Sequence, residues 1–368
     1  MAVQPQAAGV AGGPATAKIC DVIATYRPTT MFRSPTTDSC VTSLDFDDTG
    51  ELLVAACNDE TIQLYNCREG KLNKVLPSKK YGAHLARFTH HQQGVLYAST
   101  KVDGMLLSSP QYDTIRYLST HDNLFLRYFK GHTAPVTCLA ISPGSDEFLS
   151  GSVDNTVLLW SLNSAHPHGK LLLNSPYLAA FDPTASVIAI ASPSTSTVLL
   201  YDLRNYDKAP FATFDLLELE QKFTPKSVGR DWTKVEFSND GKSVLVATNG
   251  TGHFLLDAFN GDMRAFCYRK SNAPPSRAAP GRQDGVPGQG DVCFTPDGRY
   301  VVGGTNEDNI YVWDTQKEPS PDHVLKPEHE LEFKGSRGAV VAFNPRHNLF
   351  ASGDKEVVFW LPDPHAVD

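Results

Sequence analysis

The sequence has few of the features that mark membrane, secreted or metal-binding proteins. No apolar run approaches the roughly 20 residues that a membrane-spanning helix needs. The N-terminus has no basic segment followed by an apolar one, so we expect no secretory signal. Seven cysteines are scattered along 368 residues, and none forms a CxxC pair or a Cys/His cluster with zinc spacing. We therefore expect reduced thiols, no bound metal and no contact with membranes.

Positive charge is also scarce. The 33 Lys and Arg residues are outnumbered by 41 Asp and Glu residues, which gives a net charge of −8. A protein that wraps duplex DNA needs a surplus of Lys and Arg on one face, so direct nucleic-acid binding is not expected. The hydrophobic content of 41% and the charged content of 20% are ordinary for a folded chain. Residues 1–17, rich in Ala, Gly and Pro, are predicted to form a disordered tail.

An internal repeat organises the chain. Its first landmark is an alternating apolar strand that ends in Phe or Ile and is followed by a turn of Asp, Asn, Pro, Gly or Ser. Alternation that ends in such residues is typical of a half-buried strand entering a hairpin. The seven copies of this landmark end at Phe46, Phe88, Ile141, Phe181, Phe237, Phe294 and Phe343.

A second landmark, an apolar stretch that ends in Trp, Tyr or Leu, follows the first at a near-constant distance. The distance is 17 to 20 residues in six copies and 30 in the second copy. The second copy contains an extra GMLLSSPQY at 104–112, and without these nine residues its distance is 21. The first landmarks are 40 to 57 residues apart. These intervals bracket the WD-repeat period of about 40–45 residues once loops are added.

The third copy has the fullest motif, with GH at 131–132, SGSVDNT at 150–156 and a Trp four residues later. The repeat and this motif resemble the WD-repeat family over about residues 20–363. The resemblance implies a hydrogen-bonded chain of four side chains across a four-stranded blade. Its members here would be His132, Ser150 or Ser152, Asp154 and Trp160. Such a chain must be complete, because an orphaned buried member costs about 1–3 kcal/mol.

Seven such units predict an all-β fold, a seven-bladed WD-repeat β-propeller that spans residues 18–363. A closed ring removes the exposed sheet edges of an open stack. Closure usually needs a strand from the opposite end of the chain. We expect the segment at 21–26, continuing to 31–32, to complete the last blade beside 357–360. Residues 364–368 would form a short tail.

Two insertions interrupt the repeat, at 104–112 and at 269–288. The second contains four bases among prolines, so we expect it to be basic and not to pack. Its bases are Arg269, Lys270, Arg277 and Arg282. In the family's layout both insertions open on the "top" face of the ring, which commonly receives peptides. They are either docking loops or neutral loops.

Three groupings mimic reactive sites. His132, Asp154 and Ser150 resemble a nucleophilic triad, but all three match the structural chain. The histidine pair at 90–91 has no carboxylate at ligand spacing, so an exposed turn is expected. The acidic run at 215–220 could supply an acid and a base, but a short solvated helix or loop between blades four and five is expected. With no P-loop, no GxGxxG after a strand and no GxSxG elbow, we predict neither enzyme activity nor a cofactor.

The start of each innermost strand is expected to ring the channel mouth on the top face. Alignment of the repeats on their first landmarks, together with the turns before the third strands, gives seven partner-binding candidates. They are His84, Tyr177, Thr233, Asp231, Arg337, Asn58 and Glu307. An exposed Tyr177 beside Arg337 would form an anchor pair, because aromatic and Arg side chains dominate binding hot spots.

Several longer runs go beyond the generic repeat. They include DTIRYLSTHDN at 113–123, RYFKGH at 127–132, YDLRNYDKAPFATF at 201–214, FSNDGKSVLVATNG at 237–250 and the terminal FWLP at 359–362. These runs resemble the WD-repeat subunit shared by COMPASS, the histone H3 lysine-4 methyltransferase complex, and the cleavage and polyadenylation factor.

This resemblance implies a nuclear scaffold that binds short segments of partner proteins. The implied partners are the N-terminal region of a SET-domain methyltransferase, a phosphatase-module subunit of the polyadenylation machinery, and the phosphorylated tail of RNA polymerase II, directly or indirectly. The scaffold would link histone methylation and RNA 3′-end processing with transcription termination. The alternatives are a phosphoinositide-binding propeller and another WD-repeat adaptor. The former lacks its FRRG motif here, where only isolated Arg230 and Arg264 stand as candidates.

Overall fold

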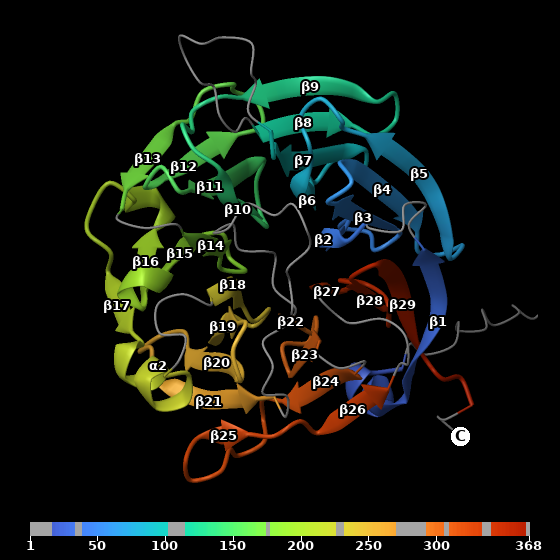
Figure 1. Cartoon of the computed structure of the whole chain (residues 1–368). Coiled ribbons are helices and arrows are strands. Elements are labelled where there is room, and N and C mark those ends of the chain that lie inside the picture. The colour runs from blue at the N-terminus through green and yellow to red at the C-terminus, as the bar shows by residue number, and fades with distance from the viewer. Residues whose placement is uncertain are drawn as a thin grey trace, which may run out of the picture.

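The computed structural model describes residues 17–33, 39–101, 115–173, 177–225, 232–269, 292–304, 309–332 and 340–365. The tail at 1–16, the insertion at 104–112 and residues 366–368 lie outside these ranges. Within them, the strands form seven sheets arranged as blades around a central axis (Figure 1). The prediction of a seven-bladed, all-β propeller is confirmed.

The first four blades each contain four antiparallel strands, ordered from the axis outward. Blade 1 contains β2 (Val41–Phe46), β3 (Leu52–Cys57), β4 (Thr61–Asn66) and β5 (Lys71–Pro77). Blade 2 contains β6 (His84–Phe88), β7 (Gly94–Ala98), β8 (Ile115–Ser119) and β9 (Leu124–Phe129). Blade 3 contains β10 (Val136–Ile141), β11 (Glu147–Ser152), β12 (Thr156–Ser161) and β13 (Gly169–Leu172). Blade 4 contains β14 (Leu178–Phe181), β15 (Val187–Ser192), β16 (Thr197–Asp202) and β17 (Ala212–Asp215).

The last three blades include strands that are exchanged along the chain. Blade 5 contains β18 (Trp232–Phe237), β19 (Ser243–Thr248), β20 (Gly252–Asp257), β21 (Met263–Tyr268) and β25 (Val324–Leu325). Blade 6 contains β22 (Val292–Phe294), β23 (Tyr300–Gly304), β24 (Asn309–Asp314) and β26 (His329–Glu332). Blade 7 contains β27 (Val340–Phe343), β28 (Phe350–Gly353), β29 (Glu356–Pro362) and β1 (Tyr26–Arg33).

Helices are few and short among the described residues. The α-helices are α1 (Ile19–Val22) and α2 (Leu217–Phe223), and the 3-10 turns are η1 (Ile23–Thr25), η2 (Pro193–Thr195) and η3 (Leu203–Asn205). No helix of the described residues is long and apolar enough to cross a bilayer.

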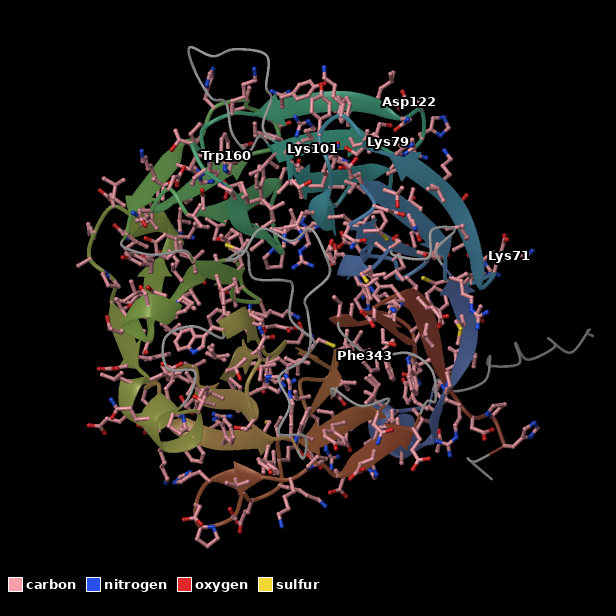
Figure 2. All side chains as sticks on the ribbon, in the orientation of Figure 1. Lys71, Lys79, Lys101, Asp122, Trp160 and Phe343 are labelled. Atoms are coloured by element: carbon pink, nitrogen blue, oxygen red, sulfur yellow. The ribbon has the colours of Figure 1, made fainter. Side chains whose placement is uncertain are left out.

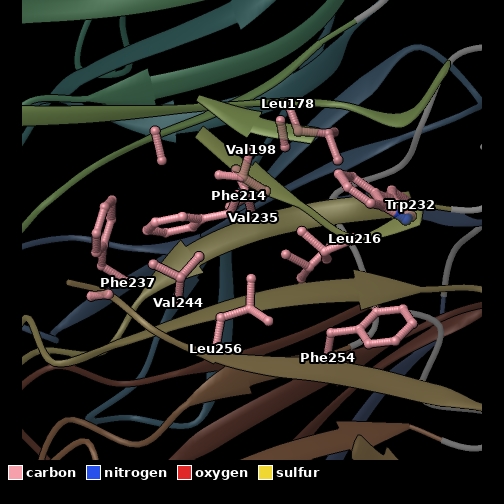
Figure 3. Packing of buried hydrophobic residues seen from close by; sticks show 14 of the residues in the cluster. Leu178, Val198, Phe214, Leu216, Trp232, Val235, Phe237, Val244, Phe254 and Leu256 are labelled. Atoms are coloured by element: carbon pink, nitrogen blue, oxygen red, sulfur yellow. The ribbon is translucent and has the colours of Figure 1, made fainter. Parts of the chain in front are cut away.

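Each blade is buried on both faces, because its neighbours stack against both. Alternate residues of β3 illustrate this arrangement: Leu53 and Ala55 pack with blade 7, whereas Val54 and Ala56 pack with blade 2. Strands with two buried faces read as continuous apolar runs rather than half-polar alternations. The core of the protein is therefore a series of layers between blades. Figure 3 shows one such layer between blades 4 and 5, where Phe214 and Trp232 belong to the same cluster.

Turns between the first and second strands also join neighbouring blades. Gly50 has a φ of +71°, a left-handed conformation that glycine adopts without steric penalty. Its carbonyl accepts a hydrogen bond of 2.7 Å from the Asn344 side-chain amide. Blades 1 and 7, far apart in sequence, are thereby joined at this end of the ring.

The outer strand of blade 7 comes from the N-terminal part of the described chain. β1 pairs antiparallel with β29, from Tyr26 opposite Pro362 to Arg33 opposite Glu356. The ring of Phe32 contacts Phe359 at a centroid distance of 5.2 Å and Tyr65 of blade 1 at 4.7 Å. This strand therefore contacts the blades on both sides of the join.

The strand was expected to begin at residue 21, and this expectation was wrong, because residues 19–25 form α1 and η1. The neighbours Val22 and Ile23 are both buried in one cluster with Tyr300 and Trp360. Successive residues of a strand point to opposite faces, whereas helical turns allow both to face one core. Ala17, assigned to the tail, also packs against this cluster.

Candidate docking site

The structural chain of blade 3 is continuous. The Trp160 indole donates to Ser150 Oγ at 2.8 Å, and Ser150 Oγ lies 2.6 Å from His132 Nε2. His132 Nδ1 lies 3.0 Å from Asp154 Oδ2, and because a carboxylate only accepts, Nδ1 donates. Ser152, the alternative member, instead donates to the Ala134 carbonyl. These bonds bring four separate segments of blade 3 into one network.

The charge of this network is fixed by its hydrogen bonds. Burial alone would raise the pKa of Asp154, but hydrogen bonds from His132, Thr156 and the Thr133 backbone outweigh burial and hold the pKa below its ordinary value. Ser150 is fully buried beneath the Trp160 indole. A nucleophile must reach its substrate, so this Ser–His–Asp grouping has the geometry of a structural support.

The expected aromatic anchor is not exposed. Tyr177 is 1% exposed and packs with Cys138 and Leu149 in the core between blades 3 and 4. The prediction of Tyr177 as an exposed anchor was therefore wrong.

The other predicted ring positions differ from one another. His84 and Thr233 are buried at the starts of β6 and β18, so neither presents its side chain to a partner in this state. Asn58 is exposed, and its side-chain oxygen accepts a 2.6 Å hydrogen bond from the Cys40 amide. The remaining candidates, Asp231, Glu307 and Arg337, lie outside the described residues.

Arg269 is buried in blade 5 and is not part of a loose basic loop. The insertion was expected to begin at Arg269, and that expectation was wrong. Residues 270–288 lie outside the described ranges. The Arg269 Nε donates to His253 Nε2 at 3.0 Å, and Nη2 donates to the Thr248 carbonyl at 2.9 Å. Burial and the Arg269 charge together hold the pKa of His253 well below its ordinary value. A neutral imidazole is the form that can accept from the guanidinium.

The acidic run at 215–220 is divided between a surface and a core role. Asp215 accepts a hydrogen bond of 2.9 Å from the Leu217 amide at the start of α2. Glu220 is buried, and its carboxylate accepts from the Trp232 indole at 2.7 Å and from the Ser196 hydroxyl. The expectation of a solvated segment was therefore wrong for Glu220, which joins blades 4 and 5.

The histidines at 90–91 also have separate environments. His90 Nδ1 lies 2.7 Å from Asp48 Oδ2, and Nε2 lies 2.8 Å from the Ser142 carbonyl, so His90 joins blades 1, 2 and 3. The His91 side chain is 66% exposed, in keeping with the expected turn. Among the described residues, no group of three or more His, Cys, Asp or Glu side chains could hold a metal ion.

The central channel has a volume of about 400 Å³ and is lined by the innermost strands. Figure 2 shows Phe343 of β27 beside it. Its charges are paired within the chain: Arg87 lies 3.7 Å from Asp45, and Lys234 lies 2.6 Å from Glu236. Paired charges of this kind leave little net field in the channel for a charged ligand.

The largest run of exposed apolar side chains in the described residues is on β9, the outer strand of blade 2. Leu124 is 59% exposed and Leu126 is 53% exposed, and the Phe125 and Tyr128 rings are also exposed. We define the blade 2 rim as Lys80, Tyr81 and β9, together with the buried Arg116, which contacts the Tyr81 and Tyr128 rings. In sequence the signal was LFLRYF at 124–129, six residues of which five are apolar or aromatic. Sequence reasoning used part of this run only as a family marker and missed its exposure.

The ring of stacked blades and the blade 3 network together define a WD-repeat propeller. The comparison with known families agrees. The family described as "WD domain, G-beta repeat" matches residues 27–66, 123–161 and 282–314.

Three relatives match the chain along nearly its whole length. It is 36% identical to "WD repeat-containing protein 82" of Drosophila melanogaster, over 94% of this chain and 96% of that protein. It is 32% identical to "Set1 complex component swd2" of Schizosaccharomyces pombe, over 92% of this chain and 98% of that protein. It is 34% identical to "COMPASS component SWD2" of Saccharomyces cerevisiae, over 88% of this chain and 91% of that protein. The chain belongs to this family of WD-repeat proteins, as its longer sequence runs predicted.

Proposed function

We propose that the chain is a non-catalytic scaffold subunit of a nuclear histone H3 lysine-4 methyltransferase complex of the Set1 type. The observation that carries this proposal is the near full-length match to proteins named as components of the Set1 and COMPASS complexes in two yeasts. These matches cover 92% and 88% of this chain.

The geometry supports a holder of partners rather than a reaction centre. The Ser150 hydroxyl is buried and engaged by Trp160 and His132, and the channel charges of Asp45 and Lys234 are paired. A ring of stacked blades gives a partner a fixed surface. A disordered partner segment loses conformational freedom only when it docks on that surface.

We further propose that the bound segments are short. They would come from the N-terminal region of a SET-domain methyltransferase and, in a second assembly, from a phosphatase-module subunit of the polyadenylation machinery. Through them the scaffold would reach the phosphorylated tail of RNA polymerase II and link methylation with RNA 3′-end processing and termination. The exposed Asn58 and the sequence positions Asp231, Glu307 and Arg337 are the proposed partner-binding residues.

The test is purification of the tagged full-length chain from nuclei, with quantitative mass spectrometry of what accompanies it. We expect a SET-domain methyltransferase in the unmutated sample and less of it with Arg337→Glu. The matched control is Arg68→Glu, at an exposed position of the turn between β4 and β5, which should recover as much as the unmutated chain. Recovery of neither methyltransferase nor polyadenylation subunits by the unmutated chain would contradict the proposed function.

A further inference from the structure

The outer strand of blade 2 is a sheet edge. β9 pairs with β8 on its inner side, and its outer side pairs with no strand of the described residues. Its position on the perimeter is visible in Figure 1. A sheet edge with free backbone groups and apolar side chains is a template on which another strand can form.

The other outer strands carry features that oppose strand addition. β5 contains two lysines and ends in Pro77, and β1 contains Pro28. The outer strands of blades 3, 4 and 6 are four residues long. β9 has six residues and contains no Pro, Gly, Lys or acid. Short strands, lysines and prolines are usual protections of sheet edges, and β9 lacks these three. Its pairing with β8 shifts register once, between Phe125 and Arg127.

Blade 5 provides an example of strand addition within the same molecule. β25 pairs in parallel with the outer strand β21, with Phe266 opposite Val324 and Cys267 opposite Leu325. The perimeter of this ring therefore accommodates a fifth strand beside a blade.

The blade 2 rim also has a firm aromatic surface. The Arg116 guanidinium lies 3.6 Å from the centroid of the Tyr81 ring and 5.8 Å from that of Tyr128. The Phe125 ring contacts Tyr81 at 5.9 Å and Tyr128 at 5.3 Å. Arg116 itself is buried, so its contacts hold the aromatic rings in place, and rings held in this way lose little freedom when a partner binds.

The charge around β9 is opposite to that of the whole chain. Residues 79–81 and 121–130 contain four basic side chains and one acid, Asp122, whereas the chain has a net charge of −8. The basic residues are Lys79, Lys80, Arg127 and Lys130. Figure 2 shows Lys79 and Asp122 on the blade 2 side of the ring. A partner segment that complements this edge would carry acidic side chains.

We infer that β9 binds an extended segment of a partner protein as an added antiparallel or parallel strand, and that this segment alternates large apolar with acidic residues. The inference rests on the proposed scaffold function, for which it names a surface and the chemistry of the bound segment. Main-chain hydrogen bonds to β9 would supply affinity. Apolar contacts with Leu126 and Tyr128, and ion pairs with Lys80 and Arg127, would supply specificity.

The test uses fluorescence anisotropy with three synthetic peptides: alternating Ile and Glu, alternating Ile and Lys, and the acidic peptide with a central Pro. We expect the full-length chain to bind the acidic peptide about tenfold more tightly than the other two. Leu126→Lys should weaken that binding about tenfold. Leu172→Lys, the same change at a 75% exposed leucine on β13, should leave it unchanged.

Arg127→Glu separates a lost docking edge from a lost fold. It should bind the basic peptide in preference to the acidic one, and an unfolded variant cannot show such a reversed preference. Equal binding by Leu126→Lys and the unmutated chain would overturn the inference. If the unmutated chain binds no peptide but forms a dimer that Leu126→Lys abolishes, the inference is overturned, and the occupant of β9 is a second copy of the chain.

The two proposals fail in different ways. If the methyltransferase accompanies the unmutated chain and Leu126→Lys equally, and no peptide binds, strand addition is wrong and the scaffold function stands. If the acidic peptide binds but no methyltransferase is recovered, the proposed function is wrong and β9 remains a docking edge for another partner.

Discussion

The indole Nε1 of Trp232 donates a 2.7 Å hydrogen bond to the buried carboxylate of Glu220. Glu220 is on α2, between blades 4 and 5, and Trp232 begins the innermost strand of blade 5. The same carboxylate accepts from the Ser196 hydroxyl in blade 4. One short helix therefore supplies a polar contact that joins two blades.

Glu220→Ala should destabilise the protein by about 1–3 kcal/mol, because it leaves the Trp232 indole and the Ser196 hydroxyl without this acceptor. Glu218→Ala, on the exposed side of the same helix, should change stability by less than about 0.5 kcal/mol. Urea unfolding followed by tryptophan fluorescence measures both. Equal losses from the two variants would show that the buried hydrogen bonds are not the cause.

Gly50→Ala should be more destabilising than Gly70→Ala. Both glycines have positive φ, at +71° and +60°, so both variants include the backbone penalty of about 1 kcal/mol. A Cβ on Gly50 would lie 2.2 Å from the Asn344 side-chain oxygen, whereas the nearest atom to one on Gly70 is 3.6 Å away. The difference in unfolding free energy between the two variants measures the clash of the new Cβ at position 50 with Asn344 of blade 7. Similar values for the two variants would contradict tight packing at this join.

Phe32→Ala should destabilise the ring. Met31→Ala, at the neighbouring position of the same strand, is its control. Phe32 contacts Phe359 and Tyr65, and we expect a loss of about 2–4 kcal/mol. Met31 is 37% exposed, so its truncation should cost less than about 1 kcal/mol. Thermal unfolding measures both, and a larger effect at Met31 would contradict the observed register of β1.

Stability should fall as pH rises through the pKa of His90. The hydrogen bond with Asp48 raises that pKa above its ordinary value of about 6.5. A raised pKa means that the folded state holds the proton more tightly. The contribution is therefore present below about pH 6.5 and is lost as pH rises through the folded-state pKa. His90→Gln should flatten this dependence, whereas His91→Gln should not; an unchanged profile in His90→Gln would contradict the assignment.

The sequence was sufficient for the fold because repeated strands and turns have a direct physical signature. The spacing from Phe46 to Tyr65 recurs to within two residues in five of the other blades, and the GH and Trp160 motif identifies the hydrogen-bonded chain. These features depend on local alternation and on turn residues, which a single chain displays without knowledge of its neighbours.

The candidate site was harder to predict, since exposure depends on the neighbouring blade. Tyr177 has the composition of an anchor, but it packs with Cys138 and Leu149 in the core between blades 3 and 4. Arg269 and Glu220 have charges typical of a surface, yet His253 and Trp232 bind them in the interior. The apolar run of β9 looked like an ordinary strand, because sequence does not distinguish an outer strand from an inner one.

The pairing of β25 with β21 has a consequence for a chain cut between blades 5 and 6. The C-terminal fragment would supply β25 to blade 5 of the N-terminal fragment, which would in return supply β1 to blade 7. Each fragment thus adds an outer strand to a sheet of the other. The two fragments, produced separately, should consequently reassemble into one ring without a peptide bond between them.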